Sequence, residues 1–184
     1  MKITNAHIIA LSNQKGIQNI TTHKVSVDHS YKVVKFKQVF NKLMKAYDES
    51  HKAILEEVGI TDEQEFNKKL AALKENKSRT EEQEKEFQNL TEQQKRLNGM
   101  SNNLLQEKVE FSGVKTLPYK EWKAMQDENS PADGDKKNEM LSGVVVVISE
   151  IKEDGTIKFE TEDVESLLEG ILWNAPSDED SPKA

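Results

Sequence analysis

The sequence predicts a mainly helical α+β protein: a long antiparallel helical hairpin, a short N-terminal helix and a small C-terminal β-hairpin with a closing helix. Three observations predict this class. Apolar residues recur at helical spacing through a proline-free stretch between residues 31 and 105. Helix-start signals come in quick succession inside that stretch. A β-branched run at 144–148, followed by Asp154-Gly155, is typical of a β-hairpin.

Composition limits the size of the core and the kinds of chemistry. The chain has 184 residues, of which 35% are hydrophobic and 32% are charged, so we expect one domain with a thin core. Cysteine is absent, which excludes disulfides, thiolate nucleophiles, iron–sulfur clusters and cysteine-type zinc sites. The longest apolar run, 144–148, is far shorter than the roughly 20 residues of a membrane span. The N-terminus lacks the apolar region of a signal peptide, so we expect an intracellular protein with no membrane contact.

Charge is distributed unevenly along the chain. Residues 1–60 hold nine lysines and five acids, whereas residues 116–184 hold seven lysines and seventeen acids. Exposed charges attract over about 8–10 Å in physiological salt. The basic front and the acidic back either attract each other, within a chain or between copies, or are ordinary solvated faces.

The N-terminal segment is expected to begin with a short helix over residues 5–14. Asn5 serves as its N-cap and Gly16 lies where it would stop, with an extended start as the alternative. Residues 17–29 alternate apolar and polar side chains, which is typical of a connecting strand or loop.

The first half of the long hairpin is predicted from one apolar stripe and two boundary signals. Asp28 or Ser30 caps a long helix that ends at Gly59. Thr61-Asp62-Glu63-Gln64 is a capping box that begins a shorter helix, and the pattern breaks near residues 76–78. The apolar positions of these two helices are Val33, Phe36, Phe40, Leu43, Tyr47, Ile54, Val58, Phe66, Leu70 and Leu73.

A second capping box, Thr80-Glu81-Glu82-Gln83, begins the second long helix. A third box, Thr91-Glu92-Gln93-Gln94, falls inside the apolar stripe of that helix, and we interpret it as incidental. Two antiparallel helices joined by a shorter one therefore form a hairpin that approximates a coiled coil. The second stripe comprises Phe87, Leu90, Leu97, Met100 and Leu104.

The pattern changes after residue 105. Residues 109–114 alternate apolar and polar side chains around Gly113, which predicts a strand or extended segment. Pro118 falls at the first position of a short helix that carries Trp122 and Met125.

The C-terminal third combines a β-hairpin with one more helix. The hairpin covers residues 144–159, and Thr161 or Glu162 begins the helix that follows. The apolar residues of that helix are Val164, Leu167, Leu168, Ile171 and Leu172.

The chain is expected to divide into four parts. Residues 1–125 form a helical domain, and residues 126–139, which are polar and lack periodicity, form a linker or loop. Residues 140–173 form the small β-hairpin plus helix, and residues 174–184 form a disordered acidic tail.

We predict no catalytic, cofactor-binding or metal-binding residue. The histidines lack the i,i+4 spacing of a helical metal site, and neither a glycine-rich phosphate loop nor G-x-S-x-G is present. His23, His29 and Asp28 are a conceivable metal set, although solvent-exposed loop histidines are the commoner arrangement. Trp122 and Trp173 fit either a binding site or the core, and we expect the core.

Nucleic-acid binding is disfavoured. The lysines of the first long helix lie opposite its apolar stripe, as in any amphipathic helix, at Lys32, Lys35, Lys42 and Lys45. The chain has only two arginines, and interleaved surface aromatics are missing.

A short helix carrying Ile8-Ile9-Ala10-Leu11 is followed by Tyr31-Lys32-Val33-Val34-Lys35 at the start of a long helix and by a charged helical middle. Leu104-Leu105-Gln106-Glu107-Lys108-Val109-Glu110-Phe111 then leads to a helix begun by proline. This order, over roughly residues 5–125, resembles small uncharacterised helical proteins that tailed phages encode among their head and tail genes. The leucine pair before alternating glutamate and apolar residues is the most recognisable stretch, and the C-terminal third departs from the pattern. The resemblance implies no catalytic residues.

These features predict a non-enzymatic, phage-type virion component or assembly factor that acts through protein–protein contacts. The expected partners are viral head or tail proteins, or the chain itself as a homo-oligomer, because an elongated hairpin with a thin core gains burial by oligomerising. The expected location is the host-cell cytoplasm or the virion. The alternative is a small acidic inhibitor of a host defence protein, which the acidic C-terminal third favours.

Overall fold

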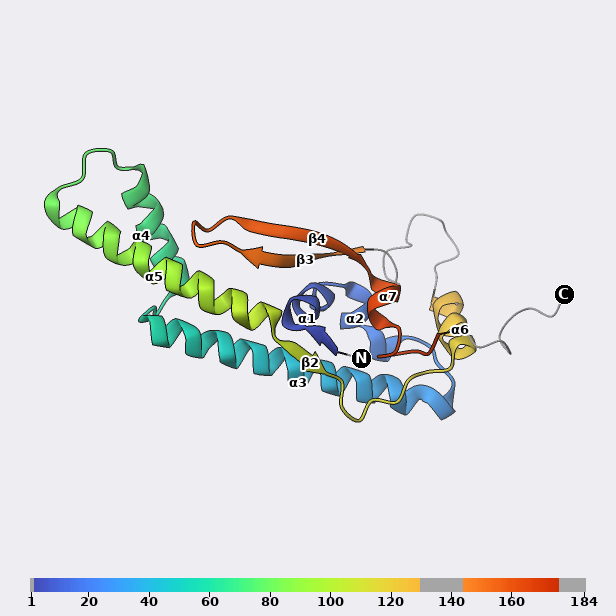
Figure 1. Ribbon diagram of the computed structural model, residues 1–184. Coiled ribbons are helices and arrows are strands. Elements are labelled where there is room, and N and C mark those ends of the chain that lie inside the picture. The colour runs from blue at the N-terminus through green and yellow to red at the C-terminus, as the bar shows by residue number, and fades with distance from the viewer. Residues whose placement is uncertain (1, 130–143, 176–184) are drawn as a thin grey trace.

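Two long antiparallel helices form the axis of the molecule (Figure 1). α3 (Val27–Val58) and α5 (Glu81–Gln106) lie side by side, and α4 (Glu63–Glu75) packs on α5 at one end. The computed structural model describes residues 2–129 and 144–175. It confirms the predicted hairpin with a shorter bridging helix and the mainly helical α+β class.

α3 forms because apolar residues return every three or four positions along it. Val33, Phe36 and Phe40 are buried on one side, and Phe36 stacks on Phe111 with ring centroids 5.4 Å apart. The helix ends at Gly59, as predicted, because φ is +80° there and a residue without a Cβ adopts that conformation without strain.

The start of α3 differs from the prediction. Ser26 is the N-cap, rather than Asp28 or Ser30. The Ser26 amide donates a hydrogen bond to the Glu121 carboxylate at 2.7 Å, so a distant residue fixes where the helix begins.

The start of α4 differs by one residue. Asp62, not Thr61, is the N-cap, because its carboxylate accepts hydrogen bonds from the amides of Gln64 and Glu65 at 2.8 and 2.9 Å. A carboxylate satisfies two of the free amides that begin a helix and also interacts favourably with the helix dipole.

The start of α5 is as predicted. The Thr80 amide donates to Gln83 Oε1 at 3.1 Å, and Thr80 Oγ1 accepts from the Gln83 amide at 3.3 Å. The box at Thr91 is incidental, as predicted, because the Thr91 hydroxyl donates to the carbonyl of Phe87 inside the uninterrupted helix.

The N-terminal segment is more helical than predicted. It forms β1 (Lys2–Thr4), α1 (Asn5–Ser12), α2 (Lys15–Gln18) and the short 3-10 helix η1 (Ile20–Thr22). Thr4 is the N-cap of α1 instead of Asn5, whose side chain donates to the carbonyl of Leu104 at 2.9 Å. Gly16 does not end a helix but lies within α2. Residues 17–29 are predicted to be a strand or a loop; no strand forms there, because the segment holds the end of α2, η1, a loop at 23–26 and the first turn of α3.

The extended segment near residue 109 forms a short strand. β2 (Lys108–Glu110) pairs antiparallel with β1, and Ile3 lies opposite Val109. The strand is shorter than the predicted 109–114, because Gly113 adopts φ +75° in a turn.

The next helix extends into the predicted linker. α6 (Tyr119–Asn129) begins one residue after Pro118, so residues 126–129 are helical rather than part of a linker. The Pro118 carbonyl accepts the first helical hydrogen bond, from the Trp122 amide at 3.0 Å. The rest of the predicted linker, 130–139, lies outside the described residues.

The C-terminal β-hairpin is confirmed. β3 (Val144–Ile151) pairs antiparallel with β4 (Ile157–Asp163), with a bulge between Ile148 and Glu150. Gly155 in the connecting turn has φ +84°.

The closing helix α7 (Val164–Leu168) is shorter than predicted. Thr161 and Glu162 belong to β4, and the Asp163 carboxylate caps the helix by accepting from the Ser166 amide at 2.8 Å. The helix ends before Gly170, which has φ +73°, so Ile171 and Leu172 are buried beyond the helix. Of the predicted tail, residues 174 and 175 are exposed, and 176–184 lie outside the described residues.

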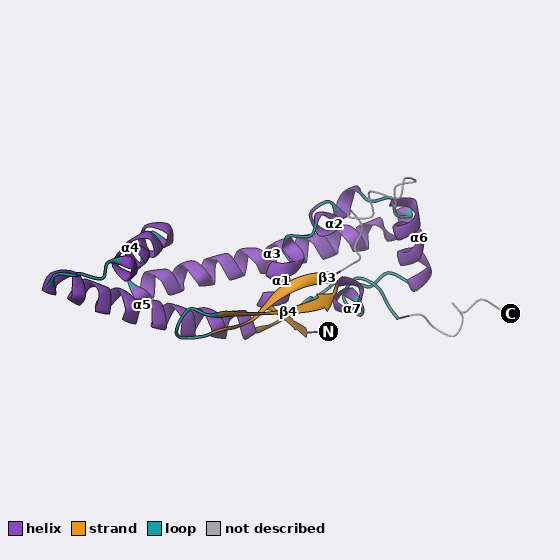
Figure 2. Ribbon diagram, turned by 90° about the horizontal axis from the view of Figure 1, so that it is seen from above, coloured by secondary structure: helices purple, strands orange, loops and turns teal. Residues whose placement is uncertain are grey.

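The main core surrounds α1, which lies between the β-hairpin and α3 (Figure 2). It takes residues from both the N-terminal and the C-terminal parts of the chain, including Ile8 and Leu11 of α1, Phe36, Trp122 and Leu168. A second, smaller cluster fills the far end of the helical hairpin and comprises Val58, Ile60, Phe66, Leu70 and Leu97.

Candidate interaction surface

The C-terminal hairpin is attached to the body of the molecule through one side of β3. Val145 and Val147 alternate along the strand and are only 2% and 3% exposed, because they pack into the main core beside α1. Alternation places Val144 and Val146 on the opposite side of the strand.

The edge of β3 that does not pair with β4 contacts side chains of α5. Asn98, Asn102 and Gln106 follow one another at intervals of four residues, so they share one face of the helix. Each meets a backbone group: Asn98 donates to Lys152 O (3.3 Å), Asn102 accepts from Ile151 N (3.2 Å) and Gln106 donates to Ser149 O (2.5 Å). These bonds satisfy the groups that a strand edge otherwise leaves open to a new strand.

β4 is anchored to α1 by one polar contact. His7 Nδ1 accepts a hydrogen bond from the Thr4 amide at 3.1 Å. In the neutral imidazole the proton then lies on Nε2, which donates to Glu162 Oε1 at 2.9 Å. This pair fixes the end of β4 nearest to α7.

The outer side of the hairpin exposes large apolar groups. Val144, Val146 and Phe159 are 65%, 58% and 59% exposed. The register places them on one face, because Val146 lies opposite Thr161, which is two residues from Phe159. We call these three side chains, together with the outer edge of β4, the hairpin surface.

The outer edge of β4 is open within the described part of the chain. There β3 is the only strand that pairs with β4, and no hydrogen bond from another segment reaches the backbone of residues 157–161. In both views β4 lies on the side of the hairpin away from α3 (Figures 1 and 2).

Opposite charges flank Phe159 along β4. Lys158 forms an ion pair with Glu150 across the hairpin. This hydrogen bond lowers the pKa of Glu150 and raises the pKa of Lys158. Glu160 is exposed and has no ion pair among the described residues. Because side chains alternate along a strand, Lys158 and Glu160 lie on the opposite face of β4 from Phe159, the face that carries Glu162. The outer face of the hairpin is therefore apolar, and the two opposite charges lie on its reverse face.

A hollow of about 350 Å³ lies between the tip of the hairpin and helices α3, α4 and α5. The Tyr47 ring stacks on His51 there, with centroids 6.0 Å apart and 10° between the planes. Burial raises the pKa of the Tyr47 phenol, and the carboxylates of Asp48 and Glu63 add to the effect. The phenol therefore stays protonated at neutral pH and is a hydrogen-bond donor rather than a base.

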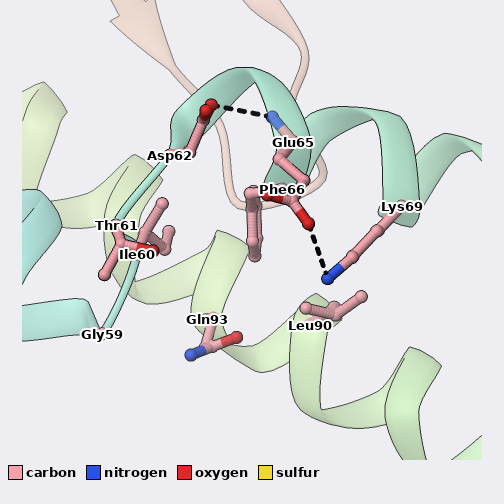
Figure 3. Close-up of a pocket in the computed structure, with 9 residues that line it drawn as sticks. All are labelled: Gly59, Ile60, Thr61, Asp62, Glu65, Phe66, Lys69, Leu90 and Gln93. Atoms are coloured by element: carbon pink, nitrogen blue, oxygen red, sulfur yellow. Dashed lines mark hydrogen bonds and ion pairs between the residues drawn. The ribbon is translucent and has the colours of Figure 1, made fainter.

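A smaller hollow of about 180 Å³ marks the joint between α3 and α4 (Figure 3). Phe66 points from α4 toward α5. Gln93 Nε2 donates to the carbonyl of Val58 at 3.0 Å, which satisfies one of the free carbonyls at the end of α3. Lys69 pairs with Glu65 at 3.0 Å on the rim. Asp62, Glu65, Lys69 and Gln93 all have structural partners, so we interpret this hollow as a packing joint.

The histidines considered as metal ligands lie near other side chains. His29 Nδ1 is 3.0 Å from Ser26 Oγ and 3.5 Å from a carboxylate oxygen of Glu121. In the ranges 2–129 and 144–175, no three His, Asp or Glu side chains, His23 and Asp28 included, are placed to hold a metal ion.

The lysine row on α3 is partly engaged within the chain. Lys32 Nζ donates to the carbonyl of Thr116 at 2.9 Å, and Lys45 pairs with Glu49 at 3.5 Å. The other two lysines of the row are exposed.

Trp122 and Trp173 complete the core, as predicted. Trp122 is fully buried and Trp173 is 5% exposed, and their rings stack with centroids 5.7 Å apart and 5° between the planes. A backbone hydrogen bond from Leu117 to the carbonyl of Leu172, at 2.7 Å, brings their two segments together.

Sequence reasoning misses the hairpin surface. Residues 144–148 are apolar at every position, so alternation does not reveal which side chains are exposed. The available signal is in β4, where Lys158 and Glu160 flank Phe159, because charged positions within a strand are typical of a sheet edge.

Comparisons with known proteins add no relative. The chain matches no family model, no curated protein and no solved structure. Within the described ranges, none of the helices has both the length and the apolar character that crossing a membrane requires.

Proposed function

We propose that this chain is a non-enzymatic protein that works through protein–protein contacts, as a virion component or assembly factor of the kind that tailed phages encode. The observation that carries the proposal is the hairpin surface, where three large apolar side chains lie beside an open strand edge. Its attribution to phages rests on the resemblance over residues 5–125.

Exposed apolar side chains gathered on one face are typical of a binding surface. Single exposed apolar residues are normal on a protein, whereas contiguous ones beside polar residues mark contact sites. A partner that adds a strand to β4 gains backbone hydrogen bonds and covers Phe159 at the same time.

Hydrogen bonds to the helices anchor both strands of the hairpin, which favours binding. The side chains of α5 fix β3, and the pair between His7 and Glu162 fixes β4. Little conformational entropy is then lost when a partner binds, so more of the contact energy becomes affinity.

The second candidate is a small acidic inhibitor of a host defence protein. Glu160 and Asp163 are exposed on the acidic stretch of β4 and α7 and support this alternative. We place it second because Asp163 caps α7 and Glu162 contacts His7. These carboxylates already stabilise the fold.

Site-specific photo-cross-linking in infected cells tests the proposal. A benzophenone amino acid replaces Phe159, or replaces Tyr31 as the control, since Tyr31 is an aromatic residue on α3 with a similar exposure of 54%. We expect protein adducts from position 159, identified by mass spectrometry as virion proteins or the chain itself. Absence of adducts at 159, with adducts at 31, would contradict the proposal, and a host defence protein at 159 would support the second candidate.

A further inference from the structure

We infer that a second copy of this chain occupies the hairpin surface, joined through β4 in an antiparallel pair centred on Phe159. The inference rests on the proposed function, for which it names the partner. The observations that carry it are the open edge of β4 and the order of charges along that strand.

Only one edge of the two-stranded sheet is open to a new strand in the described structure. At the other edge, Gln106 and Asn102 of α5 bond to Ser149 and Ile151 in the last part of β3, and α1 and α5 pack against the strand, so the helices obstruct this edge. A strand that adds to the hairpin therefore lies beside β4, where backbone amides and carbonyls have no other partner among the described residues.

Two-fold symmetry restricts how β4 pairs with its own copy. In an antiparallel pair, directly opposed positions alternate between hydrogen-bonded and non-hydrogen-bonded types. A two-fold axis midway between two neighbouring pairs would make those pairs identical, which this alternation forbids. The axis therefore passes through a single pair, in which one residue lies opposite the same residue of the second copy. Each register of the dimer is defined by that central residue.

When the pair is centred on Phe159, residues of opposite charge lie opposite each other on both sides of the axis. Lys158 of each copy lies opposite Glu160 of the other, Phe159 faces Phe159, and Ile157 faces Thr161. Cross-strand pairs of opposite charge and of aromatic rings are both favourable. Lys158 then lies between Glu150 of its own chain and Glu160 of the second copy.

The neighbouring registers place like charges together. Centring on Lys158 brings two lysines face to face, and centring on Glu160 brings two glutamates face to face. Centring on Thr161 places Glu160 opposite Glu162. Like charges directly opposite each other destabilise a sheet, so the order of charges selects Phe159.

The dimer would join the two hairpins into one four-stranded sheet. The two Phe159 rings meet at its centre, with Val144 and Val146 of each copy on the same face.

Sedimentation equilibrium of the full chain tests this pairing through charge reversal. Lys158→Glu or Glu160→Lys alone places like charges across the symmetry axis, so we expect either variant to weaken association at least tenfold. The double variant K158E/E160K restores opposite charges and should restore the dimer. Lys52→Glu is the matched control, because Lys52 forms an exposed ion pair with Glu56 on α3, away from the hairpin.

A one-to-one mixture of the two single variants gives the sharpest result. Every cross-strand pair in the heterodimer joins a lysine and a glutamate, so the mixture should dimerise although neither variant does so alone. This recovery also shows that both variants are folded, despite the loss of the pair between Lys158 and Glu150 in one of them.

A wild-type chain that stays monomeric up to millimolar concentration, or a dimer that charge reversal leaves unchanged, would overturn the inference. The proposed function is tested separately by the cross-links from position 159. Adducts with another protein from a monomeric chain would refute the dimer and leave the proposed function standing. Absence of adducts at position 159, with adducts at position 31, together with a monomeric chain would refute both.

Discussion

The amide of Ile151 donates a hydrogen bond to Oδ1 of Asn102 at 3.2 Å, which joins the end of β3 to the C-terminal part of α5. One helical turn away on either side, Asn98 and Gln106 instead donate to the carbonyls of Lys152 and Ser149. A helix thus closes one edge of the hairpin with side chains instead of a strand. Because β3 is closed in this way, β4 becomes the edge on which a partner can add.

Replacing Asn102 by alanine should destabilise the protein by about 1 kcal/mol, since the Ile151 amide loses its acceptor. Asn103→Ala is the control, because Asn103 is the next residue on α5 and is exposed. Urea unfolding of the two variants measures the difference. Equal effects of both substitutions would show that the contact between Asn102 and β3 does not stabilise the fold.

Two glycines should respond to alanine in opposite directions. Gly59 has φ +80°, so Gly59→Ala should lower the free energy of unfolding by roughly 1 kcal/mol. Gly99 lies inside α5 and a Cβ there would meet no atom within 4 Å, so Gly99→Ala should raise it by about 0.5–1 kcal/mol. Thermal unfolding followed by circular dichroism measures the melting temperature of each variant. A shift of both melting temperatures in the same direction would contradict the roles assigned to Gly59 and Gly99.

Truncating the stacked tryptophan pair should be costly. Trp122 is fully buried against Trp173, so Trp122→Ala should destabilise the protein by about 3–5 kcal/mol. Tyr31→Ala on the exposed side of α3 should change stability by less than about 0.5 kcal/mol. Denaturant titration gives both values. A cost for Trp122 no larger than that for Tyr31 would place this ring outside the core.

Stability should depend on pH through Glu84. Its carboxylate accepts a hydrogen bond from Arg79 at 2.6 Å, and this bond, with the guanidinium charge, lowers the pKa of Glu84 from its ordinary value of 4.5. Folding therefore favours the ionised form. The stabilisation is complete above the unfolded pKa and is lost as the pH falls through the lowered folded pKa.

The melting temperature of Glu84→Gln should therefore lie below that of the wild type at pH 7, with the gap closing toward pH 3. Glu82→Gln is the control, since Glu82 lies in the same helical turn and makes no ion pair with Arg79. A difference in melting temperature that stays constant across the pH range would show that the ionisation of Glu84 does not cause the difference.

Boundaries with a local physical cause could be predicted from the sequence. The capping box at Thr80 and the stop at Gly59 depend on residues within one turn of the boundary, and both are confirmed. The helix predicted to begin at Thr61 has Asp62 as its N-cap instead, because the Asp62 carboxylate accepts hydrogen bonds from two backbone amides. Local chemistry thus predicts a boundary well when one candidate is clearly the better acceptor.

Features set by distant contacts could not be predicted. The start of α3 depends on Glu121, which lies 95 residues from Ser26 in the sequence. The exposure of Val144 and Val146 depends on which side of β3 meets α1, and nothing within the strand specifies that side. The candidate surface therefore emerges only from the packing of the hairpin on the helices.

Hydrogen–deuterium exchange on the full chain tests most directly whether the hairpin surface is where the protein makes contacts. The account predicts that peptides covering β4, residues 157–163, exchange more slowly as the protein concentration rises, while peptides from α4 keep their rates. Unchanged exchange in β4 together with new protection in α4 would contradict it.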